Sequence, residues 1–229
     1  MTKMVPPRQQ RETHIFLLIS LLCATAGAVD LLAYFRLGRV FVANLTGNTV
    51  LFAYHAVAGH WRSAALRLGI IVSFFAGVVT NRFLKRWIQS ERIRFNPAVV
   101  SLAIECAILT AAAFLILHER LRIALLLLLA WAMGLQNDAF LQIGPINLNT
   151  TFLTGDIEKL GTEVATPATD TEQKRARTTR IKAFLTVWVA YGAGAMLAAT
   201  GSHFFEIRAL LIPAVMAALV IVLELTGRA

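Results

Sequence analysis

The chain has 229 residues, of which 57% are hydrophobic and only 15% are charged, with a net charge of +9. A soluble domain carries about a quarter charged residues, so too few charges remain here to cover a surface that faces water. In a soluble protein such a basic balance would indicate nucleic-acid binding, but these basic residues stand in short clusters beside apolar stretches, as is typical of cytoplasmic loops. We therefore expect an integral membrane protein that contacts the lipid bilayer and binds no nucleic acid.

Six stretches are long and apolar enough to cross a bilayer, because a crossing helix needs about 20 mostly apolar residues. They are residues 14–36, 64–82, 96–118, 121–140, 182–202 and 206–227. Helices like these also occur inside large soluble proteins, but a chain this short cannot cover six of them with protein. The first stretch contains a small-residue sequence at 24–26 that resembles a signal-peptidase site, yet it stays apolar to Phe35, and we expect it to remain uncleaved.

Two further segments are ambiguous. Residues 37–60 are apolar but interrupted by polar residues, and residues 141–166 contain a proline and several charges, so the second segment is not an ordinary lipid-facing span. If residues 37–60 crossed the membrane, the basic cluster at 82–94 would face outward, against the positive-inside rule. We therefore predict six crossings, with both termini on the cytoplasmic side. The polar stretch 166–181 is then a cytoplasmic loop.

The two halves of the chain resemble each other. Residues 27–30 (Gly-Ala-Val-Asp) precede Leu-Thr-Gly-Asn at 45–48, and residues 134–137 (Gly-Leu-Gln-Asn) precede Leu-Thr-Gly-Asp at 153–156 with nearly the same spacing. Three crossings per copy, an odd number, require the second copy to be inserted upside down, as in many transporters. The predicted fold is thus an all-α membrane domain of two inverted three-helix repeats, residues 1–118 and 119–229. Each repeat carries a broken or re-entrant Thr-Gly segment; the alternative is an amphipathic linker at the membrane surface.

Three motifs in this order resemble a known family: residues 46–49 (Thr-Gly-Asn-Thr), 133–137 (Met-Gly-Leu-Gln-Asn) and 151–155 (Thr-Phe-Leu-Thr-Gly). The chain resembles, over nearly its whole length, the YoaK-like family of uncharacterised multi-spanning membrane proteins. The resemblance implies an intrinsic protein of the bacterial cytoplasmic (inner) membrane, with no established substrate or catalytic residue to transfer. Asp138 and Asp156 depart from the family pattern, in which small or uncharged residues are more familiar at these positions.

Two carboxylates inside predicted spans are candidates for function, because a charge at the bilayer centre costs about 2.5–3.5 kcal/mol and normally faces the bundle or water. Asp30 is either a proton- or cation-linked carboxylate beside the first Thr-Gly segment, or the ion-pair partner of Arg36 or Arg39. Glu105 lies deep in the third span with no basic residue within two turns. It either pairs across helices or stays protonated.

The Thr-Gly segments can break a helix and begin the next, which leaves backbone N–H groups and a positive dipole end for an anion or polar solute. An ordinary helix cap is the alternative. Gln136 and Asn137 provide either pore-facing amides or hydrogen bonds between helices. The candidate residues of a substrate path are Asp30, Thr46, Gly47, Asn48, Thr49, Glu105, Gln136, Asn137, Thr154 and Gly155.

Ala190, Gly194 and Ala198 recur every four residues and predict close helix packing, either within the bundle or in a homo-oligomer. The sequence contains no metal-ligand spacing, nucleotide-binding loop or nucleophile motif, so we expect no metal, no cofactor and no enzyme activity. The predicted function is a small-solute or ion transporter or channel with its site between the two Thr-Gly segments. The alternatives are a non-catalytic assembly or accessory subunit, and an intramembrane enzyme that would use Asp30 with Glu105.

Overall fold

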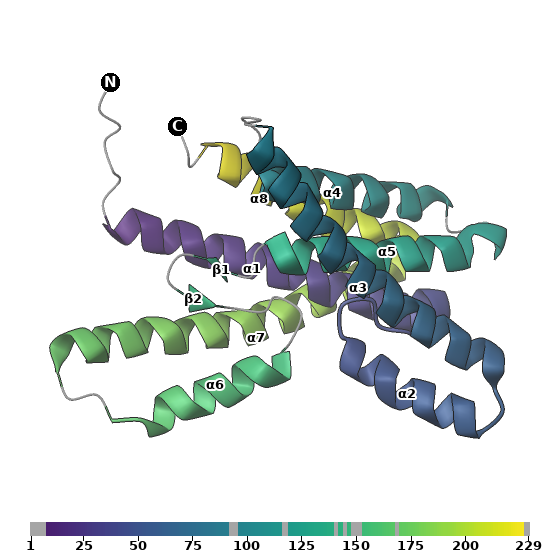
Figure 1. Cartoon of the computed structure of the whole chain (residues 1–229), viewed down its shortest axis with the longest axis horizontal. Helices are drawn as coiled ribbons and strands as arrows, with labels where there is room; N and C mark the ends of the chain where they lie inside the picture. Colours follow the sequence, from purple (N-terminus) through teal and green to yellow (C-terminus); the bar gives the residue numbers. More distant parts are fainter. Residues whose placement is uncertain are drawn as a thin grey trace.

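A computed structural model describes residues 8–91, 96–115, 119–139, 142–143, 146–147, 153–167 and 170–226. These residues are almost entirely helical (Figure 1). The helices are α1 (Arg8–Leu32), α2 (Leu45–Val57), α3 (Trp61–Ser90), α4 (Pro97–Leu115), α5 (Glu119–Ala139), α6 (Leu153–Ala165), α7 (Thr171–Phe205) and α8 (Leu211–Thr226). The π-helical turn η1 (Ala33–Gly38) extends α1, and the 3-10 turn η2 (Glu206–Leu210) joins α7 to α8. Two-residue strands β1 (Gln142–Ile143) and β2 (Ile146–Asn147) pair antiparallel.

Five stretches of the described residues are long and apolar enough to cross a membrane. They are Thr13–Gly38, Trp61–Ser90, Pro97–Leu115, Leu121–Ala139 and Thr171–Thr226. The last has 56 residues and contains α7, η2 and α8, so it includes the predicted span 182–202 and the span 206–227 up to its last residue, which lies outside the described residues. Residues 116–118 and 140, which end two of the predicted spans, lie outside the described residues. The predicted class, an all-α multi-pass membrane protein, is confirmed.

The ambiguous segment 37–60 contains the short helix α2. Its 13 residues rise about 20 Å, less than the roughly 30 Å of a bilayer core. A tight turn with Gly59 at φ +74° reverses the chain, and α2 then packs along the first part of α3. The second ambiguous segment contains α6, also of 13 residues, which packs along α7 in the same way.

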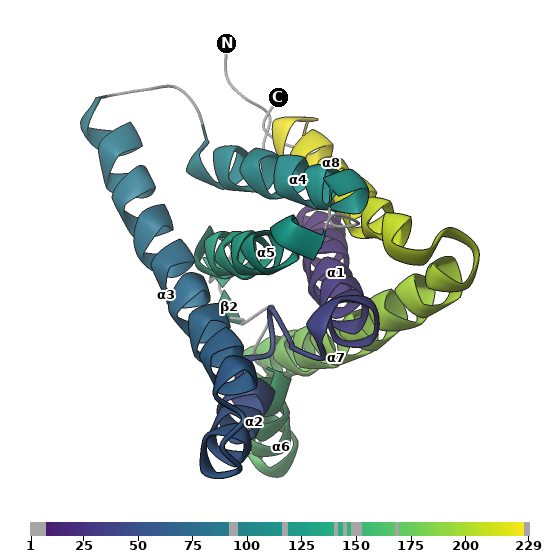
Figure 2. The ribbon, with the colours of Figure 1, turned by 90° about the vertical axis from the view of Figure 1, so that its right-hand side faces the viewer.

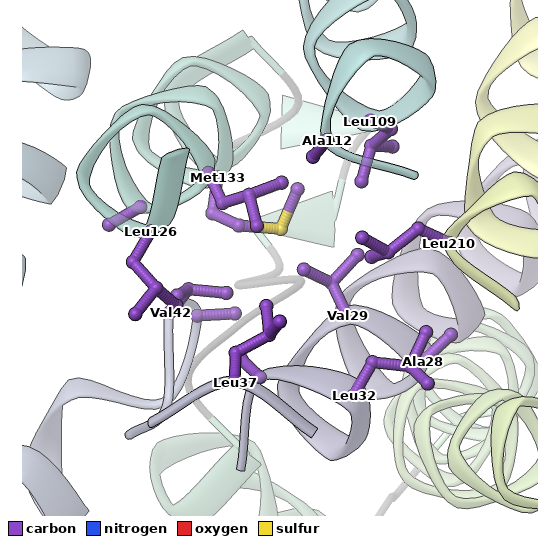
Figure 3. Packing of buried hydrophobic residues seen from close by; sticks show 14 of the residues in the cluster. Ala28, Val29, Leu32, Leu37, Val42, Leu109, Ala112, Leu126, Met133 and Leu210 are labelled. Atoms are coloured by element: carbon purple, nitrogen blue, oxygen red, sulfur yellow. The ribbon is translucent and has the colours of Figure 1, made fainter. Parts of the chain in front are cut away.

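Helices α1 and α5 form the centre of the bundle. Figure 2 shows them between α3 and α7, with α4 and α8 together along a third side. Val29 and Leu32 from α1 are buried and pack in one cluster with Leu126 and Met133 from α5, which are buried as well (Figure 3). Leu109 of α4 lies in the same cluster. Burial of these side chains is what orients the polar residues described below.

Four glycines allow helices to touch backbone to backbone. A methyl group at Gly27 of α1 would overlap the carbonyl of Tyr191 on α7, and one at Gly194 of α7 would overlap the carbonyl of Ala24 on α1. Gly77 of α3 and Gly134 of α5 make the corresponding contacts with the carbonyls of Trp131 and Phe74. Small residues permit this close approach, which van der Waals contact then stabilises.

The small-residue face of α7 therefore packs within the bundle. Gly194 lies directly against α1, and Ala190 and Ala198 are buried as well. Of the two alternatives for this face, packing inside the chain is the one observed. A homo-oligomer through these three residues is not supported, because α1 already covers them.

Candidate functional site

Asp30 is buried and its carboxylate binds the loop that follows η1. Oδ1 accepts hydrogen bonds from the backbone N–H groups of Val42 and Ala43, each at 2.7 Å. Oδ2 accepts one from Asn44 N at 2.8 Å and one from the hydroxyl of Tyr191 at 2.6 Å. Three consecutive backbone donors and one hydroxyl therefore satisfy this carboxylate, and they tie the loop to the middle of the bundle.

Asn48 holds the same loop from the other side. Its Oδ1 accepts from Phe41 N at 3.1 Å, and its Nδ2 donates to the carbonyl of Phe41. The neighbouring Gly47 lies so close to the Phe41 ring that an added methyl group would approach it to 3.0 Å. Arg67 of α3 donates from Nη2 to the carbonyl of Arg39 at 3.1 Å. We refer to residues 39–44, held by Asp30, Asn48 and Arg67, as the clamped loop; Tyr191 supports it through its hydrogen bond to Asp30.

The clamped loop brings together two of the predicted site residues, Asp30 and Asn48. Both direct their polar atoms at the backbone of the chain itself. The predicted alternative for Asp30, an ion pair with Arg36 or Arg39, does not occur in the described structure. Arg36 instead donates to the carbonyl of Ser202 at 2.8 Å. Sequence reasoning missed Tyr191 and Arg67, because their partners are more than 25 residues distant along the chain.

The clamped loop positions the N-terminus of α2. The residue before the helix, Asn44, makes no side-chain hydrogen bond to the first turn. Thr46 and Thr49 lie on the exposed face of α2, and the hydroxyl of Thr49 donates to the carbonyl of Leu45 at 3.1 Å. The first turn of α2 therefore presents its backbone N–H groups without a side-chain cap. Figure 1 shows this N-terminal end directed toward the middle of the molecule.

Helix α6 has the same direction relative to the centre, from the opposite end of the molecule (Figure 1). Gly155 is half-buried, while the side chain of Thr154 lies outside the described structure. Asp156 in the first turn is buried and forms an ion pair with Lys159 Nζ at 3.0 Å. A negative side chain therefore stands at the start of α6, whereas α2 has none there.

Gln136 and Asn137 lie near the end of α5. Gln136 is fully buried, and its Nε2 donates to the carbonyl of Leu22 on α1 at 3.1 Å. This bond is one of the two roles predicted for Gln136, a hydrogen bond between helices. Asn137 is half-buried.

A buried polar network joins α3, α4 and α5. Asp138 accepts from Asn81 Nδ2 at 2.7 Å and forms ion pairs with Lys85 Nζ at 3.1 Å and with Arg82. The hydroxyl of Ser101 donates to Asn81 Oδ1 at 2.6 Å. From the sequence, Asp138 was identified only as a departure from the family pattern, and its partners were not predicted. The available signal was the placement of Asp138 and the basic residues at 82–86 at the cytoplasmic ends of their predicted spans.

Glu105 is the exception among the buried carboxylates of the described residues. It lies near the middle of α4, is completely buried, and neither of its carboxylate oxygens has a hydrogen-bond partner. Ser101 stands one helical turn before it, on the same buried face of α4. The structure thus separates Glu105 from the clamped loop and associates it by position with the network around Asp138.

Comparison with known proteins gives the same membrane class. A family model described as a protein of unknown function (DUF1275) matches residues 18–223. The UPF0700 transmembrane protein YoaK of Bacillus subtilis (strain 168) is 30% identical over 181 residues, which cover 77% of this chain and 80% of that protein. No solved structure matches the chain. The predicted resemblance is confirmed: the chain belongs to the DUF1275 family and is related over most of its length to the transmembrane protein YoaK.

Proposed function

We propose that this protein is a transporter or channel for a small solute or ion, without enzyme activity. In this proposal it consists of two inverted copies of one unit, residues 1–118 and 119–229. It crosses the cytoplasmic (inner) membrane of a bacterium six times, with both termini in the cytoplasm. The charge distribution of the sequence supports this orientation, because most basic residues then lie inside.

The packing of the helices supports the two copies. Helix α1 packs on α7 as α5 packs on α3, α8 packs on α1 as α4 packs on α5, and α6 packs on α7 as α2 packs on α3. If α1, α2, α3 and α4 are exchanged for α5, α6, α7 and α8 in that order, every one of these packed pairs maps onto another pair of packed helices. The connection between the two copies falls between α4 and α5, at the predicted boundary.

The glycine contacts support the same correspondence residue by residue. Gly27 meets the carbonyl of Tyr191, and Gly134 meets that of Phe74; in each case the partner stands three residues before the next close glycine, Gly194 or Gly77. Those two glycines in turn meet carbonyls three residues before Gly27 and Gly134. The same register in both helix pairs is what a duplicated unit predicts.

The observation that carries the proposed function is the direction of α2 and α6. Both views place these two short helices along the same edge of the molecule (Figures 1 and 2), and Figure 1 shows their N-terminal ends toward its middle. Each N-terminus carries about half a positive charge and unpaired N–H groups. In transporters with broken helices, such ends bind the anionic or polar groups of a solute near the membrane midplane. A small anion, or a polar solute rich in acceptor oxygens, is therefore the proposed substrate class.

The clamped loop gives this arrangement a physical basis. Irregular backbone at membrane depth is tolerated only where protein buries it or water lines it. Asp30 satisfies three backbone N–H groups of the loop, and Asn48 satisfies both backbone groups of Phe41. The chain can therefore enter the bundle to the level of Asp30 and begin α2 there. In this proposal Asp30 and Asn48 shape the path, and Thr46 contacts the solute.

The alternative of an intramembrane enzyme receives no support from the carboxylates. That hypothesis required Asp30 and Glu105 to act as a pair. The carboxylate of Asp30 is occupied by four donors of the clamped loop and α7, and Glu105 has no hydrogen-bond partner among the described residues. We therefore retain transport as the proposal.

The test is solute flux into liposomes that contain the purified protein. A panel of small anions and uncharged polyols is offered, and uptake is compared with that of protein-free liposomes. Thr46→Trp places a bulky ring at the start of α2, and Val50→Trp places the same ring one turn farther along its exposed face. We expect the first variant to reduce flux at least about tenfold and the second to retain it. Flux no greater than in protein-free liposomes, or equal flux in both variants, refutes the proposal.

A further inference from the structure

Glu105 differs from every other buried carboxylate that the structure describes. Asp30 has four donors, Asp138 has Asn81 and two basic residues, and Asp156 has Lys159. Glu105 is equally inaccessible, yet both of its carboxylate oxygens lack a partner. A buried polar group without a partner is rare in folded proteins and calls for a physical explanation.

The surroundings of Glu105 provide no counter-charge. The elements packed against α4 are α3, α5, α8 and η2. The described charged side chains of these elements are Arg62, Arg67, Arg82, Lys85 and Arg86 on α3, Arg122 and Asp138 on α5, Glu224 on α8, and Glu206 and Arg208 in η2. Asp138 is paired with Arg82 and Lys85, and Glu224 accepts a hydrogen bond from Asn96 at 3.1 Å. None of them forms a hydrogen bond or ion pair with Glu105.

An ionised carboxylate in this position is therefore energetically unfavourable. Removing a carboxylate from water without a partner costs several kcal/mol even after the surrounding protein relaxes. A neutral carboxylic acid avoids most of that cost, because it buries a dipole in place of a charge. Glu105 is thus far more compatible with the fold when it carries a proton than when it does not.

A chain of polar groups leads from this position toward the end of the bundle. Ser101 stands one turn, about 6 Å, before Glu105 on α4. Its hydroxyl donates to Asn81, which donates to Asp138, which in turn accepts from Lys85. The Lys85 side chain is 28% exposed, whereas that of Asp138 is 2% exposed. The chain therefore connects the buried face of α4 with the surface, on the side that the charge distribution assigns to the cytoplasm.

We propose that Glu105 is a proton-binding site, and that its carboxyl group gives its proton to, and regains it from, water that reaches it from the cytoplasmic side along the polar groups of Ser101, Asn81 and Asp138. The proton is then the coupling ion of the transporter proposed above. The coupling of this proton to solute movement rests on that proposed function. The proton site itself is a property of the isolated protein and can be measured without any solute.

The first experiment detects the proton on Glu105 in nanodiscs by infrared spectroscopy. At neutral pH, exposed carboxyl groups are ionised, so a carbonyl band of a protonated carboxylic acid reports a buried neutral group. We expect this band in the wild-type protein, its loss in Glu105→Gln, and its retention in Glu224→Gln, in which another carboxyl of the neighbouring helix α8 is removed. If Glu105→Gln does not fold, isotope labelling of glutamate provides the test: a band that shifts with the label and persists in Glu224→Gln supports the proposal, and a band that does not shift overturns it. Absence of the band from the wild-type protein, or its persistence in Glu105→Gln, overturns the proposal.

The second experiment tests the route. Transfer into deuterated buffer shifts the carbonyl band when the carboxyl proton exchanges, and the rate of that shift measures access to Glu105. We expect Ser101→Ala, which removes the hydroxyl nearest to Glu105, to slow the shift several-fold without removing the band. Thr110→Ala removes a hydroxyl from the exposed face of the same helix and leaves the rate unchanged. Equal rates in the wild-type protein and both variants refute the route.

Coupling is tested separately in liposomes with an imposed pH gradient, using whichever panel solute the wild-type protein transports. We expect the gradient to accelerate wild-type uptake and to have no effect on Glu105→Gln. If solute moves but the gradient changes neither protein, coupling by Glu105 is refuted and transport stands. If no solute moves but the infrared band behaves as expected, the transport proposal fails and the proton site stands.

Discussion

Replacement of Asp30 by alanine tests the clamped loop most directly. The carboxylate accepts hydrogen bonds from the N–H groups of Val42, Ala43 and Asn44 and from the hydroxyl of Tyr191. Alanine removes the acceptor and leaves three buried backbone donors without a partner. The expected result is a less stable protein in which the loop no longer holds the start of α2.

The magnitude follows from the donors that lose their partner. Each buried donor left unsatisfied costs about 1–3 kcal/mol, so three of them cost at least about 3 kcal/mol. For a chain of this size, each kcal/mol lowers the melting temperature by about 2–4 °C. Asp30→Ala should therefore melt at least about 6–12 °C below the wild-type protein. Asp30→Asn should lower the melting temperature less, because the amide oxygen still accepts two hydrogen bonds.

Thermal unfolding in detergent, followed by tryptophan fluorescence, measures this order of stabilities. Hydrogen exchange at residues 42–44 provides the local test, since these amides should exchange faster in Asp30→Ala than in the wild-type protein. A melting temperature within about 1 °C of the wild type, with unchanged protection of these amides, would refute the role assigned to Asp30.

Two further predictions concern helix contacts. Gly194→Ala should destabilise the protein, because its methyl group overlaps the backbone of Ala24, whereas Gly192→Ala on the same helix faces open space and should be neutral or up to about 1 kcal/mol stabilising. Equal melting temperatures for the two variants would contradict the close contact of α1 with α7. Asp138→Asn should lower the free energy of unfolding by about 1 kcal/mol. The decrease should be smaller at high salt, because Lys85 is partly exposed and salt screens its ion pair with Asp138. Unfolding at two salt concentrations measures this, and a cost that is independent of salt would exclude the ion pair as its source.

The sequence predicted the membrane helices because the signal was long and local, but it was wrong about residues 171–181, which were predicted as loop and form the first turns of α7. Stretches of about 20 apolar residues identify membrane helices without any tertiary information. The repeated Leu-Thr-Gly motif also marked the starts of α2 and α6, since a helix break needs the same local residues wherever it occurs. These features depend on neighbours within a few positions of the chain, so one sequence is enough to find them.

The contacts of the polar residues could not be predicted, because they join distant segments. Asp30 has both a near set of partners in residues 42–44 and a remote one, Tyr191, and only the fold brings the second to it. The local sequence was equally compatible with an ion pair between Asp30 and Arg36 or Arg39. For Glu105 the sequence left pairing and protonation open, and the structure excludes hydrogen bonds and ion pairs with the described residues. The outcome depends on which helices surround α4, and residue spacing does not contain that information.

The two short helices are not electrically equivalent, and this difference makes a last prediction within the proposed transport function. Asp156 places a carboxylate in the first turn of α6, where it offsets the positive helix end, while the corresponding position of α2 is Asn48. Anions should therefore be attracted mainly by α2. Asp156→Asn removes one negative charge beside the proposed path and leaves Lys159 without this counter-ion.

Removal of that carboxylate should raise the flux of small anions and leave the flux of uncharged polyols unchanged. A carboxylate at a helix N-terminus contributes about 0.3–2 kcal/mol, so an interaction of this size transferred to the solute corresponds to an increase of about two- to thirtyfold. Glu158→Gln makes the same charge change two residues later on an exposed part of α6 and should have little effect, because solvent screens it. If both variants change anion flux equally, the net charge of the protein is responsible. If polyol flux rises as much as anion flux in Asp156→Asn, the variant has widened the path, and the helix ends do not select the solute by charge.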